Sequence, residues 1–248
     1  MYNLLIGGAA GQGIETTAAI LQKLLKKSGY HVFTSKDFMS RVRGGHNFTL
    51  IRFGTEPILS HSDKLDGIIA LNDETVEYHR AQLNENGFIL CDSKLTTDDP
   101  RAIKIDMGTI AKELGNPRVS GSIAIGAILK LFGESLAIVG DSLNGFIKEQ
   151  YVEVNKRALS EGFRIAEKRF PHLESNCSDW MILSGSQALS LGAIAAGVRF
   201  YSAYPMSPST TIMEYLASKG HADYNIHKLY RKRLRGILLL VPFQVSDM

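Results

Sequence analysis

The chain has 248 residues, 44% of them hydrophobic, and a formal net charge of +3, which is typical of a packed globular protein. Its two cysteines, Cys91 and Cys177, are too few for a four-cysteine iron–sulfur or zinc site, and they favour a reducing compartment. No apolar run approaches the roughly 18 residues of a membrane span, and the N-terminal residues MYNLLIGG do not form a signal peptide. We therefore expect a soluble, cytoplasmic protein.

The positive charge is concentrated at the C-terminal end. Residues 223–248 contain five Lys or Arg and two Asp, so this stretch alone accounts for the net charge of +3. A single basic terminal stretch is more often a solvated surface than a nucleic-acid site. We expect no nucleic-acid partner.

The first 170 residues alternate between patterns of strands and of helices, which predicts an α/β fold with a mostly parallel sheet. The expected strands cover residues 2–6, 31–34, 47–53, 58–59, 67–71, 88–91 and 103–105, with 58–59 as a hairpin partner of 47–53. The expected helices cover residues 14–27, 73–83, 122–132, 142–150 and 151–169, and residues 36–46 are expected to be irregular. The first strand, helix and second strand form a parallel βαβ unit of a three-layer, Rossmann-like domain.

A polar break over residues 171–178 marks the expected domain boundary, with domains at 1–175 and 179–222. The second unit repeats the same order, with a strand at 181–183, a helix at 188–196, a strand at 200–204 and a helix to about residue 218. Ser207 is expected to cap that last helix, with Pro208 at its first position. One such unit is an incomplete α/β domain.

The glycine-rich segment Gly7–Gly13 lies between the first strand and the first helix. Glycines allow the backbone to approach a ligand, and a helix N-terminus attracts anions, so Gly8, Gly11, Gln12 and Gly13 are candidate cofactor-binding residues. The alternative is a tight turn packed against neighbouring backbone. A nicotinamide dinucleotide is disfavoured, because no acidic residue follows the second strand to bind a ribose.

A second candidate segment, 40–47, reads SRVRGGHN. Arg41 and Arg43 beside Gly44 and Gly45 could bind a carboxylate or phosphate with close backbone support, and a solvated basic loop is the alternative. His46 taken alone is expected to be a hydrogen-bonded structural histidine.

A third candidate segment, 204–210, reads YPMSPST. Tyr204, Pro205 and the Ser207 hydroxyl stand at the start of the predicted helix, where N–H groups could bind a substrate carboxylate. Plain helix capping explains the same residues equally well.

Taken in order, these segments resemble the alpha subunits of 2-oxoacid:ferredoxin oxidoreductases in which a gamma domain precedes the thiamine-pyrophosphate pyrimidine-binding domain. The gamma-domain part of the resemblance rests on GGAAGQG, RVRGGHN, DGIIALNDETVEYH and FILCD, within residues 1–170. The second part rests on GSQALSLGAIAAGVRFYSAYPMSPSTTIMEYLA, over residues 185–217.

The resemblance implies oxidative decarboxylation of a 2-oxoacid with coenzyme A to acyl-CoA, carbon dioxide and reduced ferredoxin. Thiamine pyrophosphate supplies the carbanion chemistry, and iron–sulfur clusters carry the electrons. In the family a beta subunit mainly holds thiamine pyrophosphate with Mg²⁺, and usually a cluster. The implied partners are that beta subunit and ferredoxin, and no catalytic residue is expected in this chain.

By position, the resemblance assigns two substrate-binding residues. Ser207 falls where the family has a threonine that binds the 2-oxoacid carboxylate, and Arg43 falls where the gamma-domain loop presents a basic residue to the substrate. The remaining candidates named above in the three segments are assigned to cofactor binding.

The sequence departs from the family after Tyr224, where NIHKLYRKRLRGILLLVPFQVSDM lacks the expected glutamate for thiamine. We interpret residues 223–248 as a truncated or out-of-frame basic tail, so the isolated chain is expected to be catalytically incomplete. Two alternatives stay open: a non-catalytic assembly module of such a complex, and a Rossmann-type NAD(P) dehydrogenase.

Overall fold

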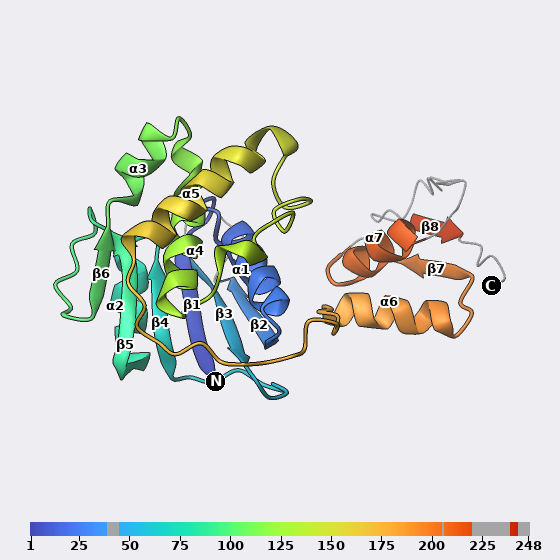
Figure 1. Ribbon diagram of the computed structural model, residues 1–248. Coiled ribbons are helices and arrows are strands. Elements are labelled where there is room, and N and C mark those ends of the chain that lie inside the picture. Colours follow the sequence, from blue (N-terminus) through green and yellow to red (C-terminus); the bar gives the residue numbers. More distant parts are fainter. Residues whose placement is uncertain (39–44, 205, 220–238, 243–248) are drawn as a thin grey trace. The chain divides into compact units, whose positions relative to one another are not determined.

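The computed structural model describes residues 1–38, 45–204, 206–219 and 239–242. The chain divides into two compact units, Met1–Trp180 and Met181–Met248 (Figure 1). The predicted tail, 223–248, lies outside the described residues except for the strand Leu239–Pro242. In the described part of the chain, no helix is both long and apolar enough to cross a membrane.

The first unit is built on a six-stranded sheet with the order β2-β3-β1-β4-β5-β6 (Figure 1). Its strands are β1 (Tyr2–Ala9), β2 (His31–Phe38), β3 (His46–Gly54), β4 (Leu65–Ala70), β5 (Leu83–Asp92) and β6 (Ala102–Ile105). Strand β3 is antiparallel to both of its neighbours, and the pairs β1–β4, β4–β5 and β5–β6 are parallel. All strands except β3 thus run in the same direction, which confirms the predicted mostly parallel sheet.

Helices cover both faces of this sheet. The helices of the unit are α1 (Ile14–Lys27), α2 (Asp73–His79), α3 (Met107–Glu113), α4 (Ser120–Leu131) and α5 (Val152–Ile165). Along β1, Leu4 and Ile6 pack in the core cluster of α1, α3, α4 and α5, whereas Leu5 packs with Val76 of α2. Because side chains alternate between the faces of a strand, the sheet is the middle of three layers, as predicted.

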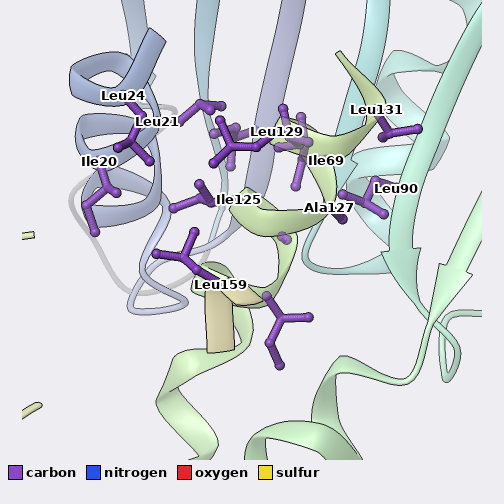
Figure 2. Close-up of a cluster of buried hydrophobic side chains, with 14 of the residues drawn as sticks. Ile20, Leu21, Leu24, Ile69, Leu90, Ile125, Ala127, Leu129, Leu131 and Leu159 are labelled. Atoms are coloured by element: carbon purple, nitrogen blue, oxygen red, sulfur yellow. The ribbon is translucent and has the colours of Figure 1, made fainter. Parts of the chain in front are cut away.

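Helix α4 is the centre of the larger core. Nine of its twelve residues are buried, which is typical of a helix with protein on every side rather than one polar face. Figure 2 shows its side chains meeting those of α1, α5, β4 and β5 in one cluster, with Ile125 and Leu129 of α4, Leu21 of α1, Ile69 of β4 and Leu159 of α5 among them. The continuous apolar run of α4 therefore reflects burial on all sides of the helix.

Two strand predictions were wrong. Residues 58–59 are not a hairpin partner of β3, and Leu59 is 91% exposed, because β1 and β2 already occupy both edges of β3. Residues 36–38 are not irregular but extend β2, whose Lys36 pairs with Thr49. The expected βαβ unit has parallel strands, but β3 lies between β1 and β2.

Two helix predictions also need correction, and one helix was missed. Residues 142–150 are not an α-helix but a loop with Gly145 at φ 86° between the short 3-10 helices Leu136–Ile138 and Glu149–Tyr151. Helix α2 ends at His79 and is followed by the 3-10 helix Arg80–Gln82. Helix α3 was not predicted.

The second unit contains α6 (Gly185–Ala195), β7 (Phe200–Ala203), α7 (Ser209–Lys219) and β8 (Leu239–Pro242). A capping box opens α6, since Gln187 N–H donates to Ser184 Oγ and Ser184 N–H donates to Gln187 Oε1. β7 and β8 pair in antiparallel fashion. The predicted strand at 181–183 is wrong, because no described strand pairs with it.

The turn before β6 contains a two-point ion pair that should make the stability of the fold depend on pH. Arg101 Nε and Nη2 donate to the two carboxylate oxygens of Asp99, at 2.9 and 2.7 Å. These hydrogen bonds lower the pKa of Asp99 from 3.8 to about 2. The pair therefore stabilises the fold above the unfolded-state pKa, and this contribution is lost as the pH falls through about 2.

We expect Asp99→Asn to lower the free energy of unfolding at neutral pH by about 1 kcal/mol, allowing for partial solvent screening. The variant should also lose stability less steeply than the unmodified chain as the pH falls from 4 towards 2. Urea unfolding at several pH values measures both effects. Asp98→Asn is the control, because Asp98 is exposed and adjacent. Equal acid sensitivity of both variants and the unmodified chain would refute the assignment.

Candidate functional site

The carboxyl ends of β1 and β4 lie side by side and lead to opposite faces of the sheet. The two strands pair in parallel from Leu4 with Gly67 to Gly7 with Ala70. The chain leaves β1 for α1 on one face, and it leaves β4 for α2 on the other. In open α/β sheets, ligands bind in the crevice at such a switch point. The topology thus places the candidate site between the loops that follow β1 and β4.

The first half of the glycine-rich segment is closely packed. Gly7 and Gly8 belong to β1. A Cβ atom at Gly7 would lie 2.6 Å from Thr75 Cγ2, and one at Gly8 would lie 2.9 Å from Leu71 Cβ. These two glycines therefore fit the packing alternative and bring β1 close to the start of α2.

The second half is open. Gly11 and Gly13 have φ values of 90° and 82°, and a Cβ atom at either would meet no atom within 4 Å. Gly13 is the N-cap of the 14-residue helix α1, and no described side chain caps this helix end. Its first-turn N–H groups and partial positive charge could bind a phosphate or carboxylate.

Gln12 joins the two loops of the site. Its Oε1 accepts a hydrogen bond from Ala9 N at 2.6 Å, and its Nε2 donates to Leu71 O at 3.2 Å. Leu71 N in turn donates to Gly7 O at 2.9 Å. Both ends of the Gln12 side chain thus bind protein backbone. Gln12, a predicted cofactor-binding residue, therefore connects the loop after β1 to the loop after β4.

The loop after β4 is held by two residues, Asn72 and Asp73, that were not among the predicted site residues. Asn72 caps α2, because its Oδ1 accepts from Thr75 N at 3.0 Å and from Thr75 Oγ1 at 2.6 Å. Asp73 Oδ1 accepts from Thr96 N at 2.7 Å. The signal was present in the sequence, since Asn followed by acidic residues directly after a buried strand is a helix-start pattern.

His46 pairs with a second histidine beneath the site. It lies opposite Ala9 in the β1–β3 register, and its Nε2 is 2.8 Å from Nε2 of His79 on α2. His79 Nδ1 is 2.7 Å from Gln82 Oε1. Both histidines are buried, and Phe48 packs against both rings. The expected hydrogen-bonded histidine is therefore present. Its partner is His79, which the sequence pattern around His46 did not indicate.

The environment keeps His46 neutral. Burial lowers its pKa, and the neighbouring His79 lowers it further, while Glu74 and Asp37 act in the opposite direction. A neutral imidazole has one N–H donor and one acceptor nitrogen. His46 Nδ1 is buried and has no hydrogen-bond partner among the described residues.

The remaining candidates separate into three groups. Gly45 is described, with φ 103° and an exposed position beside His46. Four candidates lie outside the described residues: Arg41, Arg43, Gly44 and Pro205. Tyr204 and Ser207 belong to the second unit.

In that second unit, Tyr204 and Ser207 are both exposed. Helix α7 begins at Ser209 rather than at Pro208, and Ser209 Oγ donates to the carbonyl oxygens of Tyr204 and Met206. The predicted cap position is thus shifted along the chain. The Ser207 hydroxyl is exposed before the helix, where a ligand can reach it.

The two cysteines lie in different parts of the first unit. Cys91 is buried in β5, where burial raises the pKa of its thiol, and Cys177 follows the last helix of the unit, with its Sγ 3.0 Å from His31 Nε2. Among the residues that the structure describes, no three His, Cys, Asp or Glu side chains are grouped as a metal site.

Comparisons with known proteins agree with this architecture. Residues 3–165 match the family model described as pyruvate ferredoxin/flavodoxin oxidoreductase. The 2-oxoacid:ferredoxin oxidoreductase subunit alpha of a Sulfolobus species is 23% identical over 268 residues, which cover 88% of this chain and 42% of that protein. The chain thus spans about two fifths of the length of such relatives.

Two solved structures extend the comparison. One is 2-oxoglutarate:ferredoxin oxidoreductase from Magnetococcus marinus with 2-oxoglutarate, coenzyme A and succinyl-CoA bound, with a TM-score of 0.78, 25% identity and coverage of 88% of this chain and 41% of that one. The other is the keto/oxoacid ferredoxin oxidoreductase gamma subunit from Geobacter sulfurreducens, with a TM-score of 0.58, 26% identity and coverage of 66% and 94%. Because the family model matches more than half of its residues, the chain belongs to the pyruvate ferredoxin/flavodoxin oxidoreductase family.

Proposed function

We propose that the chain is the gamma domain and the start of the pyrimidine-binding domain of the alpha subunit of a 2-oxoacid:ferredoxin oxidoreductase. The complete enzyme would convert a 2-oxoacid and coenzyme A to acyl-CoA and carbon dioxide and pass two electrons to ferredoxin. One observation carries the proposal: 88% of the chain matches a solved oxidoreductase that holds a 2-oxoacid and coenzyme A. The match extends over both units.

The switch point is the proposed contact of the first unit with coenzyme A. The uncapped N-terminus of α1, with Gly11 and Gly13 open to solvent, can bind a phosphate of this polyanion through N–H groups. Gly8 and Gln12 hold the loop in place, and His46 lies opposite Ala9 at the start of β3. Arg41, Gly44 and Gly45, which precede His46 in the sequence, are assigned to cofactor binding on the resemblance.

Two residues, Arg43 and Ser207, are proposed to bind the 2-oxoacid, and each is considered only within its own segment. Arg43 would bind the carboxylate through its guanidinium group. The exposed Ser207 hydroxyl would donate a hydrogen bond to the 2-oxoacid. These residues bind and orient the substrate, and none of them acts as acid, base or nucleophile.

Arg43→Ala should raise the KM for the 2-oxoacid by about 10- to 100-fold in the assembled enzyme, because a charge-assisted, two-point hydrogen bond is lost. The KM for coenzyme A should change much less. Steady-state kinetics with a viologen acceptor measure both constants. Arg169→Ala is the matched control, since Arg169 is an exposed arginine whose N–H donates to Leu131 O at the C-terminal end of α4. An unchanged 2-oxoacid KM would refute the role of Arg43.

The remaining cofactors are assigned to partner subunits. Thiamine pyrophosphate would supply the carbanion chemistry when bound, and on the family resemblance we place its diphosphate and Mg²⁺ on a beta subunit. With two cysteines in the chain, an iron–sulfur cluster also belongs to a partner. Ferredoxin would therefore meet the complex through that partner.

The two alternatives predict different results. A nicotinamide dehydrogenase is not favoured, because the family comparisons point to ferredoxin-linked oxidoreductases. A pure assembly module would bind the beta subunit but not coenzyme A.

The test measures binding by the chain alone and in a complex with a beta subunit. We expect saturable coenzyme A binding by titration calorimetry, no NADH binding, and co-elution with the beta subunit. The isolated chain should show no 2-oxoacid-dependent viologen reduction. Co-elution without any coenzyme A binding would favour the assembly module and refute the proposed site.

A further inference from the structure

We propose that His79 and Gln82 hold His46 in the tautomer with its proton on Nε2, so that His46 Nδ1 accepts a hydrogen bond from a ligand N–H or O–H group at the switch point. His79 and Gln82 are then positioning residues for His46. The tautomer follows from the geometry of these three side chains, and only the choice of coenzyme A as ligand rests on the proposed function.

The first step concerns Gln82 and His79. Gln82 Oε1 lies 2.7 Å from His79 Nδ1, and a carbonyl oxygen can only accept a hydrogen bond. His79 Nδ1 must therefore carry a proton. In a neutral imidazole the other nitrogen, His79 Nε2, is then an acceptor.

The second step concerns the two histidines. Their Nε2 atoms are 2.8 Å apart, so one proton lies between them. Since His79 Nε2 is the acceptor, His46 Nε2 is the donor. Double protonation is disfavoured because burial and the neighbouring His79 both lower the pKa of His46, although Glu74 and Asp37 face it with negative charge. Tyr78 adds only a ring contact to His46.

The third step concerns the free nitrogen. His46 Nδ1 is left with a lone pair and no partner among the described residues. The reverse proton order would instead leave a buried N–H without an acceptor, which is rarer in proteins. A Cβ atom at Gly7 would lie 2.9 Å from His46 Cε1, so the ring packs directly on the strand that leads into the glycine loop. An amide N–H of coenzyme A matches this acceptor.

Nitrogen-15 NMR of the complete chain tests the proton order. Long-range proton–nitrogen spectra at about pH 8, where histidine is neutral, distinguish protonated from bare ring nitrogens. His46→Gln and His79→Gln assign the signals. We expect His46 with a proton on Nε2 and His79 with a proton on Nδ1. A proton on His46 Nδ1 would overturn the proposal.

Gln82→Leu tests the anchor. It removes the acceptor for His79 Nδ1, so both histidines should show mixed tautomers, and coenzyme A should bind about 5- to 10-fold more weakly. Gln150→Leu is the control, since Gln150 is exposed. An unchanged His46 tautomer in Gln82→Leu would show that Gln82 does not position the pair.

Two substitutions of His46 distinguish its nitrogens. His46→Asn keeps a polar atom near the position of Nδ1, whereas His46→Gln keeps one near Nε2. We expect His46→Asn to bind coenzyme A within about 3-fold of the unmodified chain and His46→Gln to bind at least 10-fold more weakly. The opposite order would overturn the acceptor role. If coenzyme A does not bind the unmodified chain while the tautomers are as stated, the proposed function fails and the proton order stands.

Discussion

Gly162→Ala is expected to destabilise the first unit by about 3 kcal/mol or more, the upper end for overpacking a core. A Cβ atom at Gly162 of α5 would overlap the carbonyl oxygen of Ile123 on α4 and lie 2.7 Å from its carbonyl carbon. The contact is reciprocal, because a Cβ atom at Gly126 would overlap the carbonyl of Leu159. Backbone atoms cannot rotate away as side chains do, so the helices must separate.

Urea unfolding followed by circular dichroism measures this loss. Helix propensity alone predicts the opposite sign, since alanine is favoured over glycine by about 1 kcal/mol within helices. Gly192→Ala is the control, because Gly192 lies inside α6 and a Cβ atom there would meet no atom within 4 Å. A stable Gly162→Ala variant would mean that α4 and α5 do not pack through these glycines.

Tyr30→Phe is expected to lower the free energy of unfolding by about 2 kcal/mol, because it removes a hydrogen bond from a buried carboxylate. Tyr30 Oη donates to Glu134 Oε1 at 2.5 Å, and the Glu134 side chain is 2% exposed. His172 Nδ1 lies 2.9 Å from the same oxygen, and Leu173 N donates to Tyr30 Oη at 3.3 Å. The buried Glu134 is thus one of the points at which the segment after α5 is held to the core.

Limited proteolysis provides the second readout for Tyr30→Phe. Cleavage after Lys168 or Arg169 should become several-fold faster, because the segment that follows loses one of its attachments to the core. Tyr151→Phe is the control, since the Tyr151 side chain is exposed. Equal unfolding energies and cleavage rates for both variants would show that the Tyr30–Glu134 bond does not hold this segment.

Local patterns were sufficient for the elements that build the core. The apolar spacing of Ile14, Ala18, Leu21 and Leu25 predicted α1, and all four residues are buried. The continuous apolar run in β4 predicted a buried parallel strand. Patterns of this kind record which side of an element is buried, and they do not record which other element covers it.

The site shows the same division. The glycine-rich turn between a strand and a helix was predicted from residue types, because glycine readily adopts the positive φ angles that Gly11 and Gly13 have. The bond from Gln12 to Leu71 and the pair of His46 with His79 were not predicted. Each joins residues from separate elements, and spacing within one segment cannot indicate such a contact.

The α/β class, the glycine-rich turn at the head of α1 and the family resemblance carried by the order of the motifs could all be predicted from the residues alone. The insertion of β3 between β1 and β2, the switch point of β1 and β4, and the pair of buried histidines beneath it became visible only in the folded chain. Strand pairing and side-chain hydrogen bonds join residues that are distant in the chain, and their energy depends on the whole fold, so no local pattern records them.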